Sequence, residues 1–271
     1  MPALVADATV PGTFATLAAA LANATDGDND GKTTIQVGAG TFTGAFLVTR
    51  DDIVLEGVGP TTILRAPTGT AEIPVLTAEA VGGFELRNLT IQGTAFKPGF
   101  EIAEVADLVI DHVTIRLAAE AGAVVGCDAA QLSNLTVVDC GSGILLRDSL
   151  GISLMDGSFN SNDLEGVLVR GCTDAVIDNV TCNDNLGAGI FVRRSNSTVI
   201  RNSTCSNNLE DGMFVRENVG ITIDNCTITD NGGFGVFLRR NVGVDFDAAS
   251  GGNQGQPGSN TITGNALDAT N

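Results

Sequence analysis

Short runs of alternating apolar and polar residues recur along the chain from about residue 84 to residue 246. Each run is brief, as in AVI, VTC and IFVR, and Gly, Asn or Asp follows soon after it. Alternation with a period of two is typical of β-strands, because successive side chains point to opposite faces. The pattern therefore predicts many short strands, each with one apolar face, joined by tight turns.

The strands belong to a repeated unit that is clearest between Cys172 and Arg240. Three copies of equal length begin at Cys172, Ser195 and Asn218. A column of mainly Asn residues extends the repeat at nearly the same spacing: Asn88, His112, Asn134, Asp156, Asn179, Asn202 and Asn225. Such a period, with three short strands per copy, predicts the coils of a parallel β-helix, in which equivalent positions stack about 4.8 Å apart.

The two ends of the array follow a different pattern. Residues 13–24 predict a short helix with Thr13 as N-cap and Phe14, Leu17, Ala18 and Leu21 on one face. We expect one domain over residues 1–271: a cap region at 1–31, coils at 32–246, a loop insertion at 247–258 and a last partial coil at 259–271. The insertion explains why the residue that matches Thr227 is Thr261 and not residue 250.

The Asn column is expected at a bend between two strands. Asp224–Asn225 is the bend in the third copy, and Asn suits the left-handed conformation that a bend needs. We expect these Asn side chains to point inward and to link neighbouring coils through amide hydrogen bonds. On this interpretation His112, the single histidine, is an inner member of the column, and the Asn-x-Thr triplets are poor glycosylation acceptors.

The strand order and the Asn bend resemble the right-handed parallel β-helix of the pectin lyase-like superfamily. Residues 33–64, TTIQVGAGTFTGAFLVTRDDIVLEGVGPTTIL, also resemble the opening coils of pectinesterase-like proteins. The resemblance implies an all-β fold: a right-handed single-stranded parallel β-helix with three short strands in each coil of ~23 residues and an N-terminal α-helical cap. That superfamily includes lyases, hydrolases, esterases, epimerases and non-catalytic adhesins or tailspikes, so the resemblance specifies a fold and leaves the function open.

The strand after each turn glycine carries the main candidate site. It reads GILLR, GVLVR, GIFVR, GMFVR and GVFLR, with successive arginines one repeat apart. Alternation places Leu145, Leu168, Phe191, Phe214 and Phe237 on the same outer face as the arginines. In the superfamily that the chain resembles, the corresponding sheet forms the floor of the substrate cleft. The predicted substrate-binding residues are Arg147, Arg170, Arg193, Arg216, Arg239, Phe191, Phe214 and Phe237.

Five guanidinium groups in one column would repel one another, so the column needs a partner. An anionic polymer is one, because Arg binds carboxylates in bidentate fashion and Phe faces suit sugar rings. Local acids are another: Asp148, Glu165, Asp184, Glu210, Asp211, Glu217 and Asp230. A third interpretation is that the Phe/Leu stripe contacts another subunit.

Catalytic motifs of the superfamily are mostly missing. The chain has no Gly-His-Gly of polygalacturonase type, no Tyr-Gly-x-Asp-Pro-His of mannuronan epimerase type and no Arg-x-Pro-x-x-Arg of pectate lyase type. Catalytic residues therefore stay unidentified. If the protein is an enzyme, we expect a polysaccharide lyase, an epimerase or a glycoside hydrolase.

A candidate metal site precedes the first coil. In DGDNDGK, Asp26, Asp28 and Asp30 alternate as at the start of a calcium loop, but Val37 stands where an EF-hand has Glu. Calcium is the candidate cofactor and no other is required; a solvated turn is the alternative. The six cysteines show no C-x-x-C spacing and predict no zinc site. Cys182, Cys205 and Cys226 are expected to point inward.

The composition of the chain limits the classes of partner that it can bind. The chain has 32 acidic and 14 basic residues and a formal charge of −18, which argues against nucleic acid and anionic membranes as partners. No apolar run reaches spanning length, and no signal peptide is visible. We expect an extracellular or cell-surface protein that binds, and in one version cleaves or epimerises, an acidic polysaccharide. The alternative is a non-catalytic scaffold that forms homo-oligomers through the Phe/Leu stripe or an open C-terminal coil.

Overall fold

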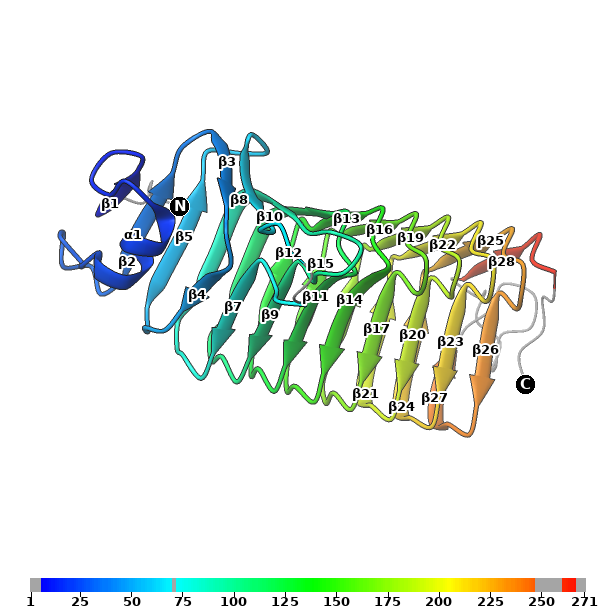
Figure 1. Ribbon diagram of the computed structural model, residues 1–271. Helices are drawn as coiled ribbons and strands as arrows, with labels where there is room; N and C mark the ends of the chain where they lie inside the picture. Colours follow the sequence, from blue (N-terminus) through cyan, green and yellow to red (C-terminus); the bar gives the residue numbers. More distant parts are fainter. Residues whose placement is uncertain (1–5, 70–71, 247–259, 267–271) are drawn as a thin grey trace.

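The computed structural model describes residues 6–69, 72–246 and 260–266 and forms a parallel β-helix (Figure 1). Its strands make a 19-stranded sheet and a nine-stranded sheet within these residues. The larger sheet holds two rows. In each coil a strand of the first row leads through a bend into a strand of the second row, and a turn then leads to the nine-stranded sheet. The predicted fold class, with three short strands per coil, is confirmed.

The strands have the following bounds. The first row contains β1 (Ala8–Val10), β2 (Thr33–Val37), β5 (Ile53–Gly57), β12 (Gln131–Ser133), β15 (Ser153–Met155), β18 (Val176–Asp178), β21 (Asn196–Arg201), β24 (Val219–Asp224) and β27 (Val242–Phe246). The second row contains β3 (Gly40–Thr43), β6 (Thr62–Arg65), β13 (Thr136–Val138), β16 (Ser158–Asn160), β19 (Thr181–Asn183), β22 (Thr204–Ser206), β25 (Thr227–Thr229) and β28 (Thr261–Thr263). Two strands, β8 (Glu85–Gln92) and β10 (Val109–Arg116), run through both rows. The nine-stranded sheet contains β4 (Phe46–Val48), β7 (Leu76–Glu79), β9 (Phe100–Ala103), β11 (Glu120–Val125), β14 (Ser142–Arg147), β17 (Val167–Arg170), β20 (Ile190–Arg193), β23 (Met213–Arg216) and β26 (Val236–Arg239).

The pairing register follows the sequence period. Strand β19 pairs with β22 so that Cys182 lies beside Cys205, its equivalent in the next repeat. Strand β25 pairs with β28 so that Thr227 lies beside Thr261, which confirms the predicted shift across the insertion. The loop insertion at 247–258 lies outside the described residues, and so do residues 259 and 267–271 of the predicted last coil.

Inward side chains of successive coils stack into one continuous core. Ile177, Cys182 and Ile190, one from each strand of a coil, are fully buried. A single coil has no second layer to cover its apolar face, so burial depends on the neighbouring coils. All six cysteines are buried free thiols, and Cys182, Cys205 and Cys226 point inward as predicted.

The prediction of inward Asn side chains at the bend is wrong. Asn179, Asn202 and Asn225 do adopt the left-handed conformation, with φ of 54°, 52° and 49°, but their side chains are exposed. The left-handed residue interrupts the alternation, so the residue after it, such as Cys226, points inward instead. The bend amides bond along the outer surface: Asn179 Nδ2 donates to Asp156 Oδ1 at 2.7 Å.

A buried amide ladder does exist, but in the turns after the second row. Asn185 donates from its backbone N and from Nδ2 to Asn208 Oδ1, at 3.1 and 2.9 Å. Asn208 makes the same two bonds to Asn231 Oδ1. The members of the ladder are Asn162, Asn185, Asn208, Asn231 and Asn265. Their regular spacing in the sequence was the signal, and the inner role belongs to this Asn column and not to the one at the bend.

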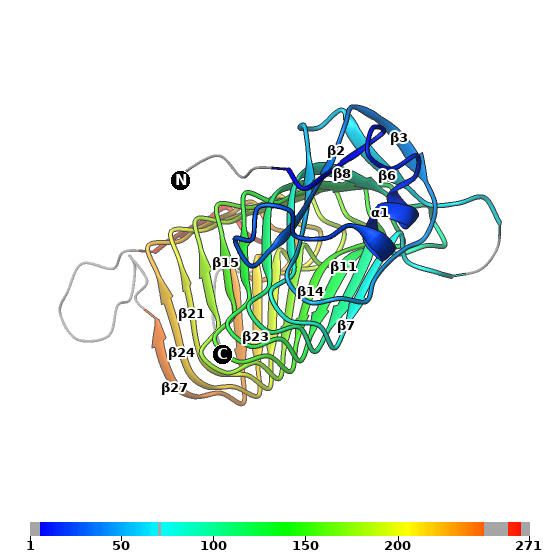
Figure 2. The same ribbon diagram turned by 90° about the vertical axis from the view of Figure 1, so that its left-hand side faces the viewer.

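The N-terminal cap contains α1 (Leu17–Asn23), which packs against β1, β2 and β4 at the N-terminal end of the coils (Figure 2). Its N-cap is Thr16 and not Thr13, since Thr16 Oγ1 accepts a hydrogen bond from Ala19 N at 3.2 Å. Arg50 donates to the carbonyl oxygens of Leu21 and Ala24 and so anchors the end of the helix. No helix in the described part of the chain is long and apolar enough to cross a membrane.

Candidate functional site

The outer face of the nine-stranded sheet is built by strict alternation along each strand. In β20, Ile190 and Val192 are buried, whereas Phe191 and Arg193 are partly exposed. Strands β17 and β23 repeat this pattern with Leu168 and Phe214 on the outer face. Five strands of the sheet, β14, β17, β20, β23 and β26, therefore carry one apolar side chain and one arginine on the outer face.

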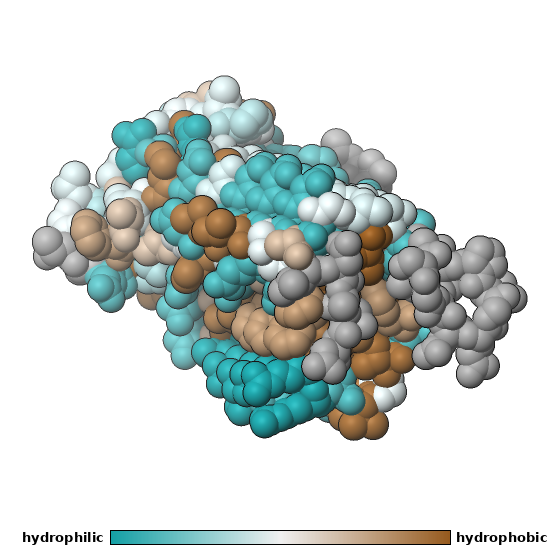
Figure 3. Space-filling model, turned by 90° about the vertical axis from the view of Figure 1, so that its right-hand side faces the viewer, coloured by the Kyte–Doolittle hydropathy of each residue, from teal (hydrophilic) through white to brown (hydrophobic). Residues whose placement is uncertain are grey.

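Strand pairing turns these residues into two columns. Arg147, Arg170, Arg193, Arg216 and Arg239 are successive partners in register. Leu145, Leu168, Phe191, Phe214 and Phe237 are paired in the same way. Because these strands run downward in Figure 1, the arginines lie along the lower edge of the molecule; hydrophilic residues gather along that edge in Figure 3, with an apolar strip above them. The predicted geometry of the two columns, which we call the Arg/Phe strip, is confirmed, and its binding role stays a prediction.

The aromatic part of the strip is a stack of parallel rings. The ring centroids of Phe191 and Phe214 lie 4.6 Å apart with an interplanar angle of 8°. Phe237 continues the stack at 5.1 Å from Phe214, and Phe234 lies 4.9 Å from Phe237. Offset stacking of this kind stabilises each pair by about 0.5–1.5 kcal/mol beyond area burial. Phe234 was not predicted, because it lies in the turn before β26.

Glu217 forms ion pairs with the middle of the arginine column. Its carboxylate lies 2.8 Å from Arg216 Nη2, 3.0 Å from Arg194 Nε, 3.6 Å from Arg193 Nε and 3.7 Å from Arg240 Nη1. The hydrogen bonds from Arg216 and Arg194 lower the pKa of the Glu217 carboxyl to about 2.

The remaining arginines of the column are less engaged. Arg147 Nε is 3.7 Å from Asp148, with both side chains partly exposed. For Arg170 and Arg239 no ion pair is formed within residues 6–69, 72–246 and 260–266. Of the seven acids considered as local partners, only Asp148 and Glu217 pair with the column. Local acids therefore pair with Arg147, Arg193 and Arg216, and the binding of a polymer by the column stays a prediction.

Acidic side chains occupy the opposite edge of the same face. Glu120, Glu165 and Asp211 lie at or just before the starts of β11, β17 and β23. Burial, with a contribution from Glu210, raises the pKa of Asp211, although its Oδ1 accepts a hydrogen bond from Phe234 N at 2.7 Å. The face thus runs from acids at one edge, across the Phe/Leu column, to arginines at the other.

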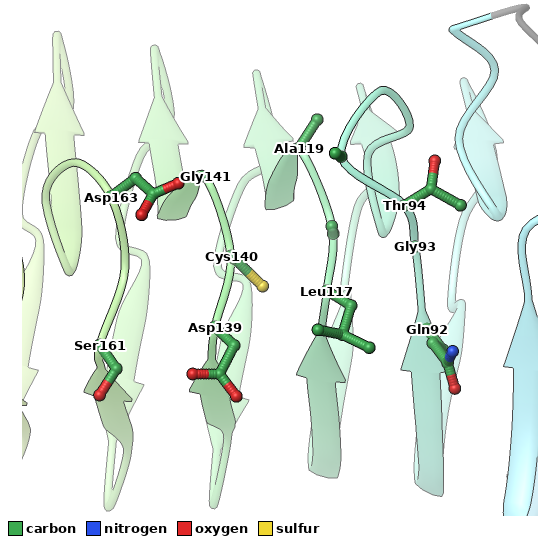
Figure 4. Close-up of a pocket in the computed structure, with 12 residues that line it drawn as sticks. Gln92, Gly93, Thr94, Leu117, Ala119, Asp139, Cys140, Gly141, Ser161 and Asp163 are labelled. Atoms are coloured by element: carbon green, nitrogen blue, oxygen red, sulfur yellow. The ribbon is translucent and has the colours of Figure 1, made fainter.

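A hollow of about 580 Å³ opens beside this acidic edge, and the sequence analysis missed it (Figure 4). It is lined by the turns of four successive coils: Gln92–Ala95, Leu117–Ala119, Asp139–Gly141, Ser161 and Asp163. Three residues connect Arg116 to Glu120 and Val138 to Ser142, whereas seven connect Gln92 to Phe100 and six connect Asn160 to Val167. Two short turns between longer ones leave this hollow, which we call the notch. The unequal turn lengths were the signal in the sequence.

The predicted calcium ligands come together only in part. Carboxylate oxygens of Asp26 and Asp28 lie within 4.8 Å of one another and of Asp7, and Asp30 is not a member of this group. Partial desolvation and the charges of Asp30, Asp7 and Asp26 raise the pKa of Asp28, against an opposing hydrogen bond from Asp30 N. Asp7 Oδ1 accepts a hydrogen bond from Gly27 N at 2.6 Å, which brings the two segments together.

His112 lies on the outside of the bend and not on the inside as expected. Its φ is 53°, its side chain is 60% exposed, and Nδ1 is 2.9 Å from Asp111 Oδ2. Burial alone would raise the pKa of Asp111, but hydrogen bonds from Ser133, Asn134 and His112 outweigh it and lower that pKa. Ser133 and His112 both bond to Asp111, and Ser133 does not donate to His112. The three residues therefore form a polar network on the surface.

Comparisons with known proteins agree with this architecture. Residues 121–267, more than half of the chain, match the family described as right handed beta helix region. No curated protein sequence matches the chain. Among solved structures, the A-module of Azotobacter vinelandii mannuronan C-5 epimerase AlgE6 superposes with a TM-score of 0.66 at 18% identity, over 87% of this chain and 78% of that one.

Two further structures are similar at the level of the fold. The enzymatically active domain of bacteriophage CBA120 tailspike protein 2 has a TM-score of 0.69 and 14% identity, over 89% of this chain and 43% of that one. An alginate lyase from Paenibacillus sp. str. FPU-7 has a TM-score of 0.59 and 13% identity, over 93% of this chain and 96% of that one. At these identities the likeness supports the fold alone.

Proposed function

Because this chain belongs to the family of right-handed β-helix regions, we propose that it is a carbohydrate-binding β-helix that holds an acidic polysaccharide on its Arg/Phe strip. The similar structures include a mannuronan epimerase module and an alginate lyase, and mannuronan and alginate are uronic-acid polymers. A ligand of this kind would be met outside the cell, so we also propose an extracellular or cell-surface location. The proposal concerns binding and assigns no catalytic residue.

The observation that carries the proposal is the register of the two columns. Five arginines, in a chain with a formal charge of −18, stand in one line beside a stack of phenylalanine rings. Guanidinium groups bind carboxylates through paired hydrogen bonds, and the strand spacing repeats such sites about every 4.8 Å. Aromatic faces beside them offer apolar contact to the C–H faces of sugar rings. A linear polyanion running along the helix axis fits both columns.

Within this strip, Arg170 and Arg239 are the arginines best placed to bind the polymer. Both are exposed, and neither forms an ion pair in the described part of the chain. Arg193 and Arg216 share Glu217, so an incoming carboxylate must compete with a carboxylate that is already there. The proposal therefore assigns initial contact to Arg170 and Arg239.

The test is affinity electrophoresis in gels that contain polygalacturonate. We expect the native protein to be retarded at low salt and released at high salt, because the contacts are exposed charges. Arg170→Gln combined with Arg239→Gln should weaken retardation about three- to tenfold. The matched control is Arg201→Gln, which removes an arginine of β21 that pairs with Asp178 at 2.9 Å on the other sheet. Equal retardation of the double variant and the native protein would remove the strip from the proposal.

Self-association is a second candidate function, favoured by exposed apolar side chains beside the same face. Leu164, Leu186 and Leu209 are 55%, 52% and 65% exposed on the turns that lead into β17, β20 and β23. Exposed apolar groups of this kind often mark contact surfaces. On this proposal the native protein is a dimer or larger in light scattering, and Phe214→Asp or Leu209→Asp yields monomers. A native protein that stays monomeric at high concentration would exclude it.

A further inference from the structure

The notch between the turns is a candidate binding site separate from the Arg/Phe strip. Its volume of about 580 Å³ is within the range of about 300–1,000 Å³ typical of small-molecule sites. It lies on the turns between the second row and the nine-stranded sheet, whereas the arginines lie at the other end of the strands in that sheet (Figure 1). A ligand in the notch would therefore contact none of the five arginines.

The floor of the notch is backbone and small side chains. A Cβ on Gly141 would lie 2.3 Å from the carbonyl oxygen of Ala119, so the two short turns stack too closely for any larger residue there. Gly141 N donates to Ala118 O at 2.9 Å, which holds the turns together. The buried side chains of Ala118 and Cys140 complete the floor, and no long side chain fills the space above them.

Two carboxylates flank this floor. Asp139 lies at the end of β13, and the side chain of Asp163 reaches over the turn at Gly141 (Figure 4). Both are exposed, and neither carboxylate has a hydrogen bond or an ion pair among the described residues. Burial, followed by the charges of Asp139 and Asp163, raises the pKa of the Cys140 thiol to about 11, although two backbone hydrogen bonds oppose the shift.

The chemistry of the lining selects the ligand class. Ionised carboxylates only accept hydrogen bonds, and the Thr94 and Ser161 hydroxyls and the Gln92 amide can both donate and accept. No lysine or arginine lines the notch, so nothing there would balance the charge of a uronate. The exposed side chain of Leu117 offers apolar contact to the C–H face of a ring. A ring that carries several hydroxyl donors and no negative charge matches all three features.

We infer that the notch binds a neutral saccharide unit, with Asp139 and Asp163 accepting hydrogen bonds from its hydroxyls. This second site does not depend on the Arg/Phe strip. It binds a neutral sugar, whereas the strip is proposed to bind an acidic one. A glycan that combined neutral and acidic units could use both sites.

The test is a titration of the native protein with neutral tetra- to hexasaccharides of glucose, galactose and mannose, followed by saturation-transfer NMR. For an oligosaccharide that binds the native protein, Asp139→Asn combined with Asp163→Asn should weaken the affinity by about fivefold or more, because charge-assisted hydrogen bonds are lost. The control is Asp184→Asn, which changes the same turn position two coils further on, with φ of 57° against 55° at Asp139. Asn tolerates this conformation at positions 139 and 184, and Asp163 is exposed, so none of the three substitutions should unfold the protein.

The outcomes separate the alternatives. Binding that is lost in the double variant, kept in Asp184→Asn and unchanged by salt supports the neutral-sugar site. The inference is overturned if no neutral oligosaccharide binds at millimolar concentration, or if the double variant binds equally well. It is also overturned if only cationic probes, spermidine and chitosan oligomers, bind in a salt-sensitive way. The retardation of the double Asn variant in polygalacturonate gels measures binding at the strip alone. A negative result for the notch can therefore be told apart from a negative result for the strip.

Discussion

At the scale of single residues, Glu217 determines how many arginines of the column are free to bind an incoming anion. Its carboxylate stands within 3.7 Å of four guanidinium groups, two of which belong to the column. One carboxylate therefore divides the column, with Arg170 and Arg147 on one side and Arg239 on the other. The charge pattern along the strip is set by this residue as much as by the arginines.

Replacing Glu217 should strengthen polyanion binding. In Glu217→Gln, the Arg193 and Arg216 guanidinium groups lose their shared anion and become available to the polymer. We expect the affinity for polygalacturonate to rise roughly two- to fivefold at low salt, as for exposed charge pairs. Glu210→Gln is the matched control, since Glu210 pairs with no arginine of the column. An affinity that falls, or that does not change, would show that Arg193 and Arg216 do not bind the polymer.

The same residue predicts a pH dependence of stability. Its pKa is lowered from 4.5 to about 2 in the folded chain, so its contribution is complete above about pH 4.5 and is lost as the pH falls toward 2. The melting temperature of the native protein, relative to that of Glu217→Gln, should therefore be constant above about pH 5 and decline between about pH 4.5 and pH 2. Melting curves followed by circular dichroism at each pH would measure this; a constant difference down to pH 2 would contradict the assigned ion pairs.

At the scale of the element, buried asparagine side chains hold the later turns between the second row and the nine-stranded sheet, at Asn162, Asn185, Asn208 and Asn231. Asn208 Nδ2 donates to Cys182 O and Asn231 Oδ1, and Asn208 Oδ1 accepts two hydrogen bonds from Asn185. Such a network is favourable only because every donor and acceptor is satisfied. The ladder therefore fixes the turns on which the acidic edge and the exposed leucines are placed.

Breaking the ladder should destabilise the fold. Asn208→Ala leaves Asn185 N buried without a partner and removes the hydrogen bonds to Cys182 O and Asn231 Oδ1, and we expect a loss of about 2–4 kcal/mol in the free energy of unfolding. Denaturation in urea would measure it. The control is Asn207→Asp, because Asp184 and Asp230 occupy the equivalent exposed position in neighbouring coils. Similar losses for both variants would mean that the ladder is not the cause.

The loop before the first coil carries the calcium prediction. The oxygens of Asp7, Asp26 and Asp28 converge, and carboxylate oxygens are the ligands that calcium prefers. If calcium binds there, millimolar calcium should raise the melting temperature, and Asp28→Asn should abolish the rise, whereas Asp30→Asn should retain it. No calcium-dependent shift in the native protein would dismiss the site and favour a solvated turn.

At the scale of the whole molecule, the sequence period determined the register, and through it the fold. Residues one repeat apart are neighbours, as Phe191 and Phe214 show, so the two columns could be predicted from the sequence alone. The side on which the bend Asn points could not be derived from alternation, because the left-handed residue adds one outward position. Asp148 and Glu217 were among the seven acids predicted as local partners, but the sequence could not single them out, nor show that Glu217 also pairs with Arg194 and Arg240 outside the column.

The notch could not be predicted from any single turn. Each short turn is unremarkable by itself, and a hollow arises only because two of them, at Ala118 and Cys140, lie between longer turns. Differences in turn length are visible in the sequence once the strands are aligned. Their consequence for the surface depends on the stacking of four consecutive coils.

The most direct test of the central claim is arginine footprinting with phenylglyoxal, read by mass spectrometry, with and without oligogalacturonate. If the polymer lies along the Arg/Phe strip, Arg170 and Arg239 should be protected from modification, while Arg201 on the other sheet should react equally in both samples. Protection of Arg201 but not of Arg170 and Arg239, or no protection of any arginine at saturating ligand, would contradict the account.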